Sequence, residues 1–223
     1  MDWQALRLSV LLAVLTAILL IPIGIFLGRW LANGRGLLRD LLQACFTLPL
    51  VLPPTVMGYY LLVLFGRDTY LGQFFEAVSG HNLVFSFQGI LLASLLFNLP
   101  FAFSPIQRAF EAIPLEFKDA AKTCGLGFWS TLLKIELPLA WPGVLSALMM
   151  TAAHTLGEFG VVLMVGGSIP GQTKTISIAI YDQVQSFDMH GAGIMSAILL
   201  VFALLTLWVS TMLTQAKRIY KST

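Results

Sequence analysis

Long stretches without charged residues dominate this sequence. The first runs from Leu8 to Leu27 and contains no Asp, Glu, Lys or Arg. About 20 apolar residues in a helix, rising 1.5 Å each, cross the roughly 30 Å hydrocarbon core of a bilayer. Only 11% of the 223 residues are charged, whereas about 25% is usual in soluble domains. The chain is therefore predicted to be an all-α integral membrane protein.

Five membrane spans are expected within a single domain of residues 5–214. They are placed at residues 8–27, 41–65, 83–103, 144–165 and 194–213. A cleaved signal peptide is the competing interpretation of the first span. That span is longer than the roughly 7–15 apolar residues of a signal peptide, and no A-x-A cleavage site follows it. Its Gly24 and Gly28 form a small-xxx-small pair, which predicts a packing face against another span.

The second span carries the sequence LPLVLPPT at residues 48–55. Its prolines, Pro49, Pro53 and Pro54, remove backbone donors, so residues 41–65 are expected to kink or break. Within lipid, a break is tolerated only where protein or a cavity satisfies the freed carbonyl groups. We interpret this span as a bent, pore-facing element, and a simple packing kink is the alternative.

The distribution of positive charge predicts the topology. With five spans, ten of the 13 Lys and Arg residues fall on one side, and only Arg7, Arg67 and Lys174 fall on the other. The positive-inside rule then places the N-terminus outside and the C-terminus in the cytoplasm. The net charge of +2 is too small to suggest nucleic-acid binding. Cys45 and Cys124 form no metal-like cluster, so no metal, cofactor or disulfide is expected.

The fourth span contains ionisable residues, which are costly at membrane depth and suggest a function by default. His154 and Glu158 are four residues apart on a helix face, so a hydrogen bond between them is expected. One interpretation is a proton relay or gate. The other, which we favour, is a buried pair that fixes helix packing or lines a wet cavity. Thr151 and Glu158 are the candidate pore or gate residues.

A short polar insert within a predicted cytoplasmic loop at residues 105–136 interrupts the apolar runs. Four of its residues recur at i, i+3, i+4 and i+7 and give a helix with one small apolar face. These residues are Phe117, Ala120, Ala121 and Cys124. Pro114 favours the start of this helix and Gly125 its end. Because alanines admit close backbone approach, we predict a docking helix for another protein. An ordinary loop helix is the alternative.

The pattern D-A-A-x3-G-x9-I-x-L-P, which begins at Asp119, resembles the EAA loop of ABC importer permeases. Asp119 stands where that family usually has Glu. In those permeases the loop forms a coupling helix that sits in a groove of a cytoplasmic ATPase. The resemblance implies that Glu116 and Asp119 face the ATPase, with Asp119 supplying a charged contact. It also implies that Ala120 and Ala121 form the close-packed face and that Gly125 forms the tight exit turn.

Three further segments extend the resemblance to the membrane subunits of bacterial molybdate ABC importers. They are TLPLVLPPTVMGYYLL at residues 47–62, LGEFG at 156–160 and IPGQT at 169–173. Because sulfate and tungstate permeases share versions of the last two, sulfate, tungstate or another oxyanion is the alternative cargo. The resemblance implies a type I ABC importer transmembrane domain in the bacterial inner membrane. It further implies a homodimer, two copies of an ABC ATPase subunit and an extracytoplasmic molybdate-binding protein.

ATP hydrolysis is expected on the partner subunit, so the chain itself is not predicted to be an enzyme. Gly166 and Gly171 imitate the glycines of a phosphate-binding loop, but Gln172 occupies the lysine position and no strand is predicted before it. An intramembrane enzyme is disfavoured because His154-x3-Glu158 lacks the second histidine of a zinc helix. A proton-coupled secondary transporter would use His154 and Glu158 as its relay, but it has no use for the insert at Asp119.

Overall fold

The computed structural model describes residues 2–34 and 36–219, and within them every regular element is helical. Two of the ten positive charges assigned to the cytoplasm, Arg35 and Lys221, lie outside the described residues. In the described part, four helices are long and apolar enough to cross a membrane. The number rises to five if one sharply bent helix pair is counted as a broken span.

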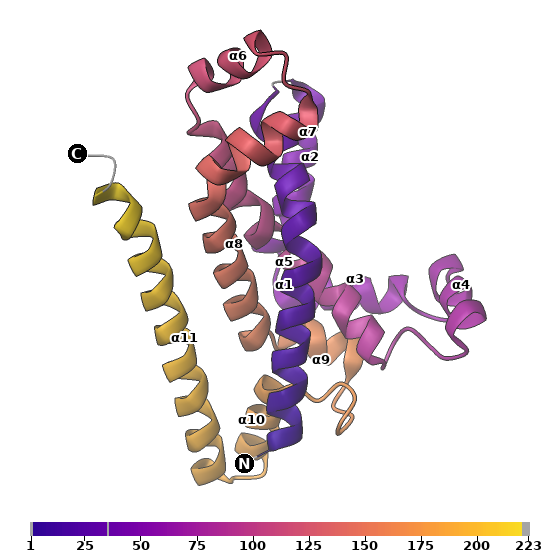
Figure 1. The fold of residues 1–223 in the computed structure, drawn as a ribbon. Helices are drawn as coiled ribbons and strands as arrows, with labels where there is room; N and C mark the ends of the chain where they lie inside the picture. The colour runs from indigo at the N-terminus through magenta and orange to yellow at the C-terminus, as the bar shows by residue number, and fades with distance from the viewer. Residues whose placement is uncertain (1, 35, 220–223) are drawn as a thin grey trace.

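Three long helices form the centre of the molecule. They are α1 (Trp3–Ala32), α5 (Phe87–Glu111) and α8 (Leu137–Gly157), and each packs against the other two (Figure 1). Asp2 caps α1 by accepting a hydrogen bond from the Ala5 amide at 3.0 Å. Such caps satisfy backbone donors that a helix leaves free at its start. The start of α1 is thereby fixed. Each of the three helices extends beyond the span expected for it at one end or both.

The backbones of α1 and α5 meet at two glycines. A Cβ atom on Gly24 would lie 3.0 Å from the Ala102 carbonyl oxygen, and one on Gly28 would lie 2.9 Å from the Gln107 amide nitrogen. Only glycine therefore permits this approach without movement of the neighbouring backbone. The predicted small-xxx-small packing face is confirmed, and its partner is α5.

The second expected span does not run straight. It consists of α2 (Leu37–Thr47), a 3₁₀ turn (Leu48–Leu50) and α3 (Pro54–Leu64), and the two α-helices are bent by 108° at the break. The cause is the proline cluster that the sequence indicates, since Pro53 precedes α3 and Pro54 is its first residue. The predicted kink or break within residues 41–65 is therefore confirmed, and the structure shows that it is a sharp one.

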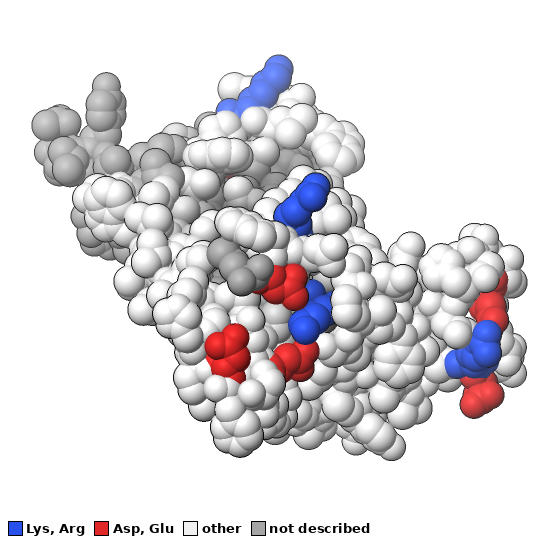
Figure 2. All heavy atoms as spheres, turned by 90° about the horizontal axis from the view of Figure 1, so that it is seen from below, with Lys and Arg blue, Asp and Glu red and all other residues white. Residues whose placement is uncertain are grey.

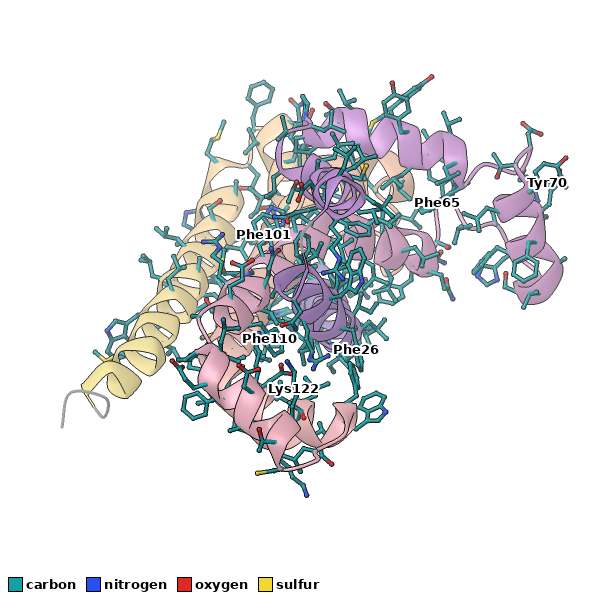
Figure 3. The ribbon with its side chains drawn as sticks, turned by 90° about the horizontal axis from the view of Figure 1, so that it is seen from above. Phe26, Phe65, Tyr70, Phe101, Phe110 and Lys122 are labelled. Atoms are coloured by element: carbon teal, nitrogen blue, oxygen red, sulfur yellow. The ribbon has the colours of Figure 1, made fainter. Side chains whose placement is uncertain are left out.

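A lateral arm follows this break. It is formed by α3 and α4 (Tyr70–Ser79), and it projects sideways from the three central helices (Figure 1). At its base α3 packs on α9 (Gly160–Gly166). Tyr70 lies on the far part of the arm, away from the bundle, and its side chain is 94% exposed (Figure 3).

The fourth expected span is also interrupted. Helix α8 ends at Gly157, and α9 begins at Gly160, so the continuous helix predicted over residues 144–165 is wrong. Glu158 lies in the break with a ψ angle of 125°, which is extended rather than helical. Glycines on both sides of the break lower helix propensity, which favours an interruption here.

The last two helices return the chain along the bundle. Helix α10 (Ile176–Gln185) leads into α11 (Met189–Ile219), which packs on α10 and α8. Helix α1 begins at the α10 end of the molecule, and α11 runs from that end towards the opposite one (Figure 1). The described chain therefore traverses the bundle an odd number of times, as the five-span topology requires.

The two ends of the bundle differ. One end carries α6 (Leu115–Thr123), α7 (Phe128–Thr131) and a π-helical segment (Leu132–Glu136), as Figures 1 and 3 show. The opposite end carries the start of α1 and α10, and a small group of acidic and basic side chains lies there on an otherwise mostly uncharged surface (Figure 2). The polar insert identified in the sequence thus forms a separate helix at one end of the bundle.

Candidate functional site

Helix α6 presents a polar surface at the end of the bundle. Glu116 lies in its first turn and is exposed, and the Lys122 side chain on the same helix is 80% exposed (Figure 3). The Asp119 side chain is 68% exposed and forms an ion pair with Lys122 at 3.2 Å. Exposed pairs of this kind contribute little to stability. Both acidic residues are therefore free to make contacts outside this chain.

The two alanines of α6 occupy different environments. Ala120 is exposed, whereas Ala121 is only 2% exposed and is covered by its own chain. The small apolar face predicted for this helix borders a groove of about 360 Å³ between α6 and the start of α8. The groove is lined by Phe117, Ala120, Ala121, Cys124, Leu126, Lys134, Ile135, Pro138 and Leu139. Of the two alanines, only Ala120 can meet another protein directly.

Helix α6 ends in a tight turn built on Gly125. The Leu126 amide donates to the Ala121 carbonyl oxygen at 3.0 Å, and the Gly125 amide donates to the Lys122 carbonyl oxygen at 2.9 Å. These two bonds form a Schellman motif, which requires a left-handed residue after the cap. Gly125 supplies it with φ +69°. The chain direction after α6 is thus fixed by one glycine.

A second cluster of polar residues is buried between α5 and the break after α8. Glu158 is only 3% exposed. Its Oε2 atom accepts hydrogen bonds from the Ser94 hydroxyl at 2.9 Å and from the Asn98 amide at 3.2 Å. None of the ion pairs in the described part of the chain involves Glu158. Neutral donors from α5 therefore hold this side chain.

Asn98 connects the members of this cluster. Its Nδ2 group also donates to the Ser94 carbonyl oxygen at 2.9 Å, and its Oδ1 atom lies 2.8 Å from His154 Nδ1. A carbonyl oxygen can only accept, so the orientation of the Asn98 amide is fixed and its Oδ1 must accept from His154. His154 Nδ1 therefore carries a proton. The imidazole ring also stacks on Phe101, with 4.0 Å between ring centroids.

The predicted hydrogen bond between His154 and Glu158 is absent from the hydrogen bonds of the described residues. Because α8 ends at Gly157, Glu158 turns away from the helix face that His154 occupies. Asn98 bridges the two side chains instead. The sequence shows Asn98 only as a polar residue near the end of an apolar run, and nothing in its spacing indicates these partners.

Glu158 and helix α8 retain unused hydrogen-bonding capacity. Glu158 Oε1 and Thr151 Oγ1 are both buried without a hydrogen-bond partner in the described part of the protein. Buried polar atoms are normally satisfied, so each exception calls for an explanation. Throughout residues 2–34 and 36–219, no group of three His, Cys, Asp or Glu side chains is placed to hold a metal ion. The arrangement can therefore accept or donate hydrogen bonds, and it offers no cluster suited to metal chemistry.

Comparison with known proteins places the chain among transport proteins. Residues 7–219 match the family described as "Binding-protein-dependent transport system inner membrane component". The chain is 41% identical over 207 residues to the molybdenum transport system permease protein ModB of Azotobacter vinelandii, covering 93% of this chain and 92% of that protein. It is 34% identical over 218 residues to ModB of Escherichia coli K12, covering 97% and 95%.

A solved structure shows the same fold. The inward facing MetNI methionine ABC transporter superimposes with a TM-score of 0.72 at 16% identity, covering 96% of this chain and 95% of that one. The fold class predicted from the sequence, a type I ABC importer transmembrane domain, is confirmed. With its apolar helices and this fold, the chain is a multi-pass inner membrane protein and belongs to the binding-protein-dependent transport system inner membrane component family.

Proposed function

We propose that this chain is the permease subunit of an ATP-driven importer that moves molybdate across the bacterial inner membrane. Two copies form the translocation path, two copies of a separate ABC ATPase drive it, and an extracytoplasmic molybdate-binding protein delivers the anion. The choice of molybdate rests on the 41% identity to a molybdenum permease along 93% of the chain.

The observation that carries the motor-driven mechanism is the exposed helix α6 at one end of the bundle. Its outward-facing groups are Glu116, Asp119 and Ala120, and its exit is fixed by the Gly125 turn. A short polar helix with a rigid exit suits insertion into a groove of another protein. We assign Asp119 the charged contact to the ATPase and Ala120 the close approach. Ala121 supports the turn from inside.

The mechanism needs no catalytic residue in this chain. ATP binding closes the two ATPases, each moves the α6 helix seated in it, and the two permease copies rock between outward-open and inward-open states. Such a change requires contacts that differ between the two states, and α6 is where the motor makes them. Docked binding protein then releases its anion into the path between the copies.

We assign Thr151 and Glu158 to the pore or its gate. Glu158 lies in the break between α8 and α9, Thr151 is buried within α8, and both have a polar atom without a partner in the described residues. A charged carboxylate would repel an oxyanion. Glu158 therefore acts best as a hydrogen-bonding anchor that holds the break against α5, while the Thr151 hydroxyl is free to donate to cargo or water.

Reconstitution tests the function. The permease is purified with its ATPase, placed in proteoliposomes and supplied with the binding protein, and uptake of molybdate, tungstate and sulfate is measured separately. Molybdate uptake that requires hydrolysable ATP and the binding protein is the expected result. A non-hydrolysable ATP analogue is the matched control and should give no uptake.

The other arms separate the alternatives. Faster uptake of sulfate or tungstate than of molybdate at equal concentration would show that the cargo assignment is wrong. Uptake that continues without ATP and collapses with an uncoupler would show a proton-coupled carrier. That result would show that the ATP-driven mechanism is wrong.

A further inference from the structure

An ion pair is buried at the α6 end of the bundle. The Arg29 Nε of α1 lies 2.5 Å from Glu136 Oε2, and the two side chains are 16% and 2% exposed. Every other ion pair among the described residues has at least one partner that is 38% exposed or more. The two residues are 107 positions apart. The pair therefore joins distant parts of the chain at a protected position.

Both ends of one segment contact the Arg29 side chain. This segment, residues 128–136, connects the Gly125 turn of α6 to the start of α8. At its beginning, the Phe128 ring centroid lies 4.2 Å from the Arg29 guanidinium carbon, a cation–π contact. At its end, Glu136 pairs with the same guanidinium. Any displacement of the segment thus acts on Arg29.

Two additional contacts tie α1 to the same region. Phe26, one turn before Arg29, meets Trp129 edge to face at 5.8 Å. Lys118 of α6 donates to the Asn33 side chain at 2.6 Å, and Asn33 caps the end of α1 by donating to the Arg29 carbonyl oxygen. Helix α6 is therefore connected to α1 directly and through residues 128–136.

The local geometry suggests a role beyond stability. Residues Leu132–Glu136 form a π-helical turn, a rare conformation that recurs at functional sites. A buried ion pair is a weak device for stability, because burying both charges removes their hydration and an apolar pair of similar volume often serves as well. Fixing one arrangement of two elements is the better-supported use of such a pair.

We propose that Arg29 and Glu136 are positioning residues that transmit the movement of α6 to α1. This inference rests on the proposed function, because it takes α6 to be the element that the ATPase moves. The path runs from α6 through the Gly125 turn and residues 128–136 to Arg29. From there it continues along α1, which is held against the α5 backbone at Gly24 and Gly28. Through this pair, α1 moves together with α6 when the ATPase moves α6.

A double variant separates this role from a structural one. Arg29→Gln or Glu136→Gln alone strands one buried charge, so each single variant is expected to lower the melting temperature. Arg29→Gln with Glu136→Gln removes both charges, which relieves that penalty but leaves the link broken. The matched control is Arg67→Gln with Glu76→Gln. It removes an exposed ion pair at the lateral arm, in which Arg67 Nη2 lies 2.7 Å from Glu76 Oε1.

Two quantities are measured on the complete complex in proteoliposomes. The first is molybdate transported per ATP hydrolysed. The second is the nucleotide-dependent change in distance between spin labels on Gln4→Cys in the two copies, in a Cys45→Ser, Cys124→Ser background. Gln4 is exposed near the start of α1, at the opposite end from α6. The second readout does not depend on the cargo.

The double variant at the buried pair should hydrolyse ATP with a melting temperature nearer to wild type than either single variant. Its transport per ATP should fall about fivefold or more, the lower range of coupling between sites. Its label distance should no longer change with nucleotide. The control pair should leave both quantities unchanged. Wild-type values of both quantities in the double variant would overturn the proposal, because the pair would then be structural only.

A further variant and the wild-type complex complete the test. If the double variant yields no complex, Arg29→Lys decides, because it keeps the charge but loses the planar fork and its face over Phe128. A wild-type ratio in Arg29→Lys would overturn the proposal. If the label distance in the complex with an intact Arg29–Glu136 pair does not change with nucleotide, both the proposed function and this inference are wrong. If the label distance does change but the complex carries a different oxyanion, only the cargo assignment is wrong. Transport per ATP is then measured with that anion.

Discussion

Asn98 of α5 and Glu158, 60 residues later, are joined by a hydrogen bond of 3.2 Å inside the bundle. The same amide group also bonds the Ser94 carbonyl oxygen, and its oxygen accepts from His154. One neutral side chain thereby holds α5, α8 and the break after α8 together. Both ionisable residues of the cluster depend on it.

Replacement of Asn98 by Ala should destabilise the protein more than replacement of Ser94 by Ala. Asn98→Ala leaves the His154 Nδ1 donor without its partner and takes one of two bonds from Glu158. Each buried group left without a partner costs about 1–3 kcal/mol. Ser94→Ala removes a single donor from an oxygen that keeps its bond to Asn98, and it should cost about 1 kcal/mol. Thermal unfolding in detergent measures both, and equal losses would contradict the central role of Asn98.

Replacement of Gly125 by Val should uncouple transport from ATP hydrolysis. A Cβ atom at Gly125 meets nothing within 4 Å, so the substitution causes no clash. The cost comes from φ +69°, a left-handed conformation that disfavours an ordinary residue by about 1–2 kcal/mol. The exit turn of α6 then opens, and transported molybdate per ATP is expected to fall.

Gly127→Val is the matched control for the turn. Gly127 also has free space around its Cβ position, but its φ of −70° and ψ of 170° suit a β-branched residue. Normal coupling is therefore expected. An equal loss of coupling in both variants would show that the left-handed turn is not the cause.

Replacement of Gly28 by Ala should loosen the contact between α1 and α5. The added Cβ would lie 2.9 Å from the Gln107 amide nitrogen, which belongs to backbone and cannot rotate away. Overpacking of this kind costs about 1–3 kcal/mol, read as a lower melting temperature. Gly193→Ala in α11 is the control, because a Cβ there meets nothing within 4 Å and alanine favours a helix over glycine, so the variant should melt no lower than wild type. Equal melting of all three proteins would refute the tight packing.

Cysteine labelling tests the orientation in the membrane. Cys124, exposed at the α6 end, should react with a membrane-impermeant maleimide only after the cytoplasmic face is opened. Tyr70→Cys, made in a Cys45→Ser, Cys124→Ser background, should react in intact cells because Tyr70 is 94% exposed on the lateral arm. The reverse pattern would invert the proposed topology.

The class of the fold and the helix at residues 115–123 could be predicted from local patterns. Long uncharged runs of about 20 residues indicate membrane-spanning helices. The spacing of small residues, with Pro114 before them and Gly125 after them, predicts a short helix, which the structure shows as α6. The proline cluster also predicted a disturbance at Pro53. How sharply the chain bends there depends on what α3 packs against, and α9 is distant in sequence.

The contacts of the polar residues could not be predicted. A helical repeat pairs His154 with Glu158, but the helix stops between them, and their common partner comes from α5. Likewise nothing near Arg29 in the sequence indicates Glu136. Such pairings are set by how whole helices pack, and a single sequence carries no direct record of that packing.

Helix α11 differs from the other long helices in how little of it the protein covers. Of the 18-residue apolar window within Met189–Val209, 11% is buried, against 56% for the corresponding part of α5. Its own chain therefore restrains this helix only through α10 and α8, and the rest of its apolar surface is open to lipid or to a second copy. Among the long helices, α11 is thus the one whose position depends most on what surrounds the chain, whereas α1 and α5 are held together by their own backbone contact at Gly24 and Gly28.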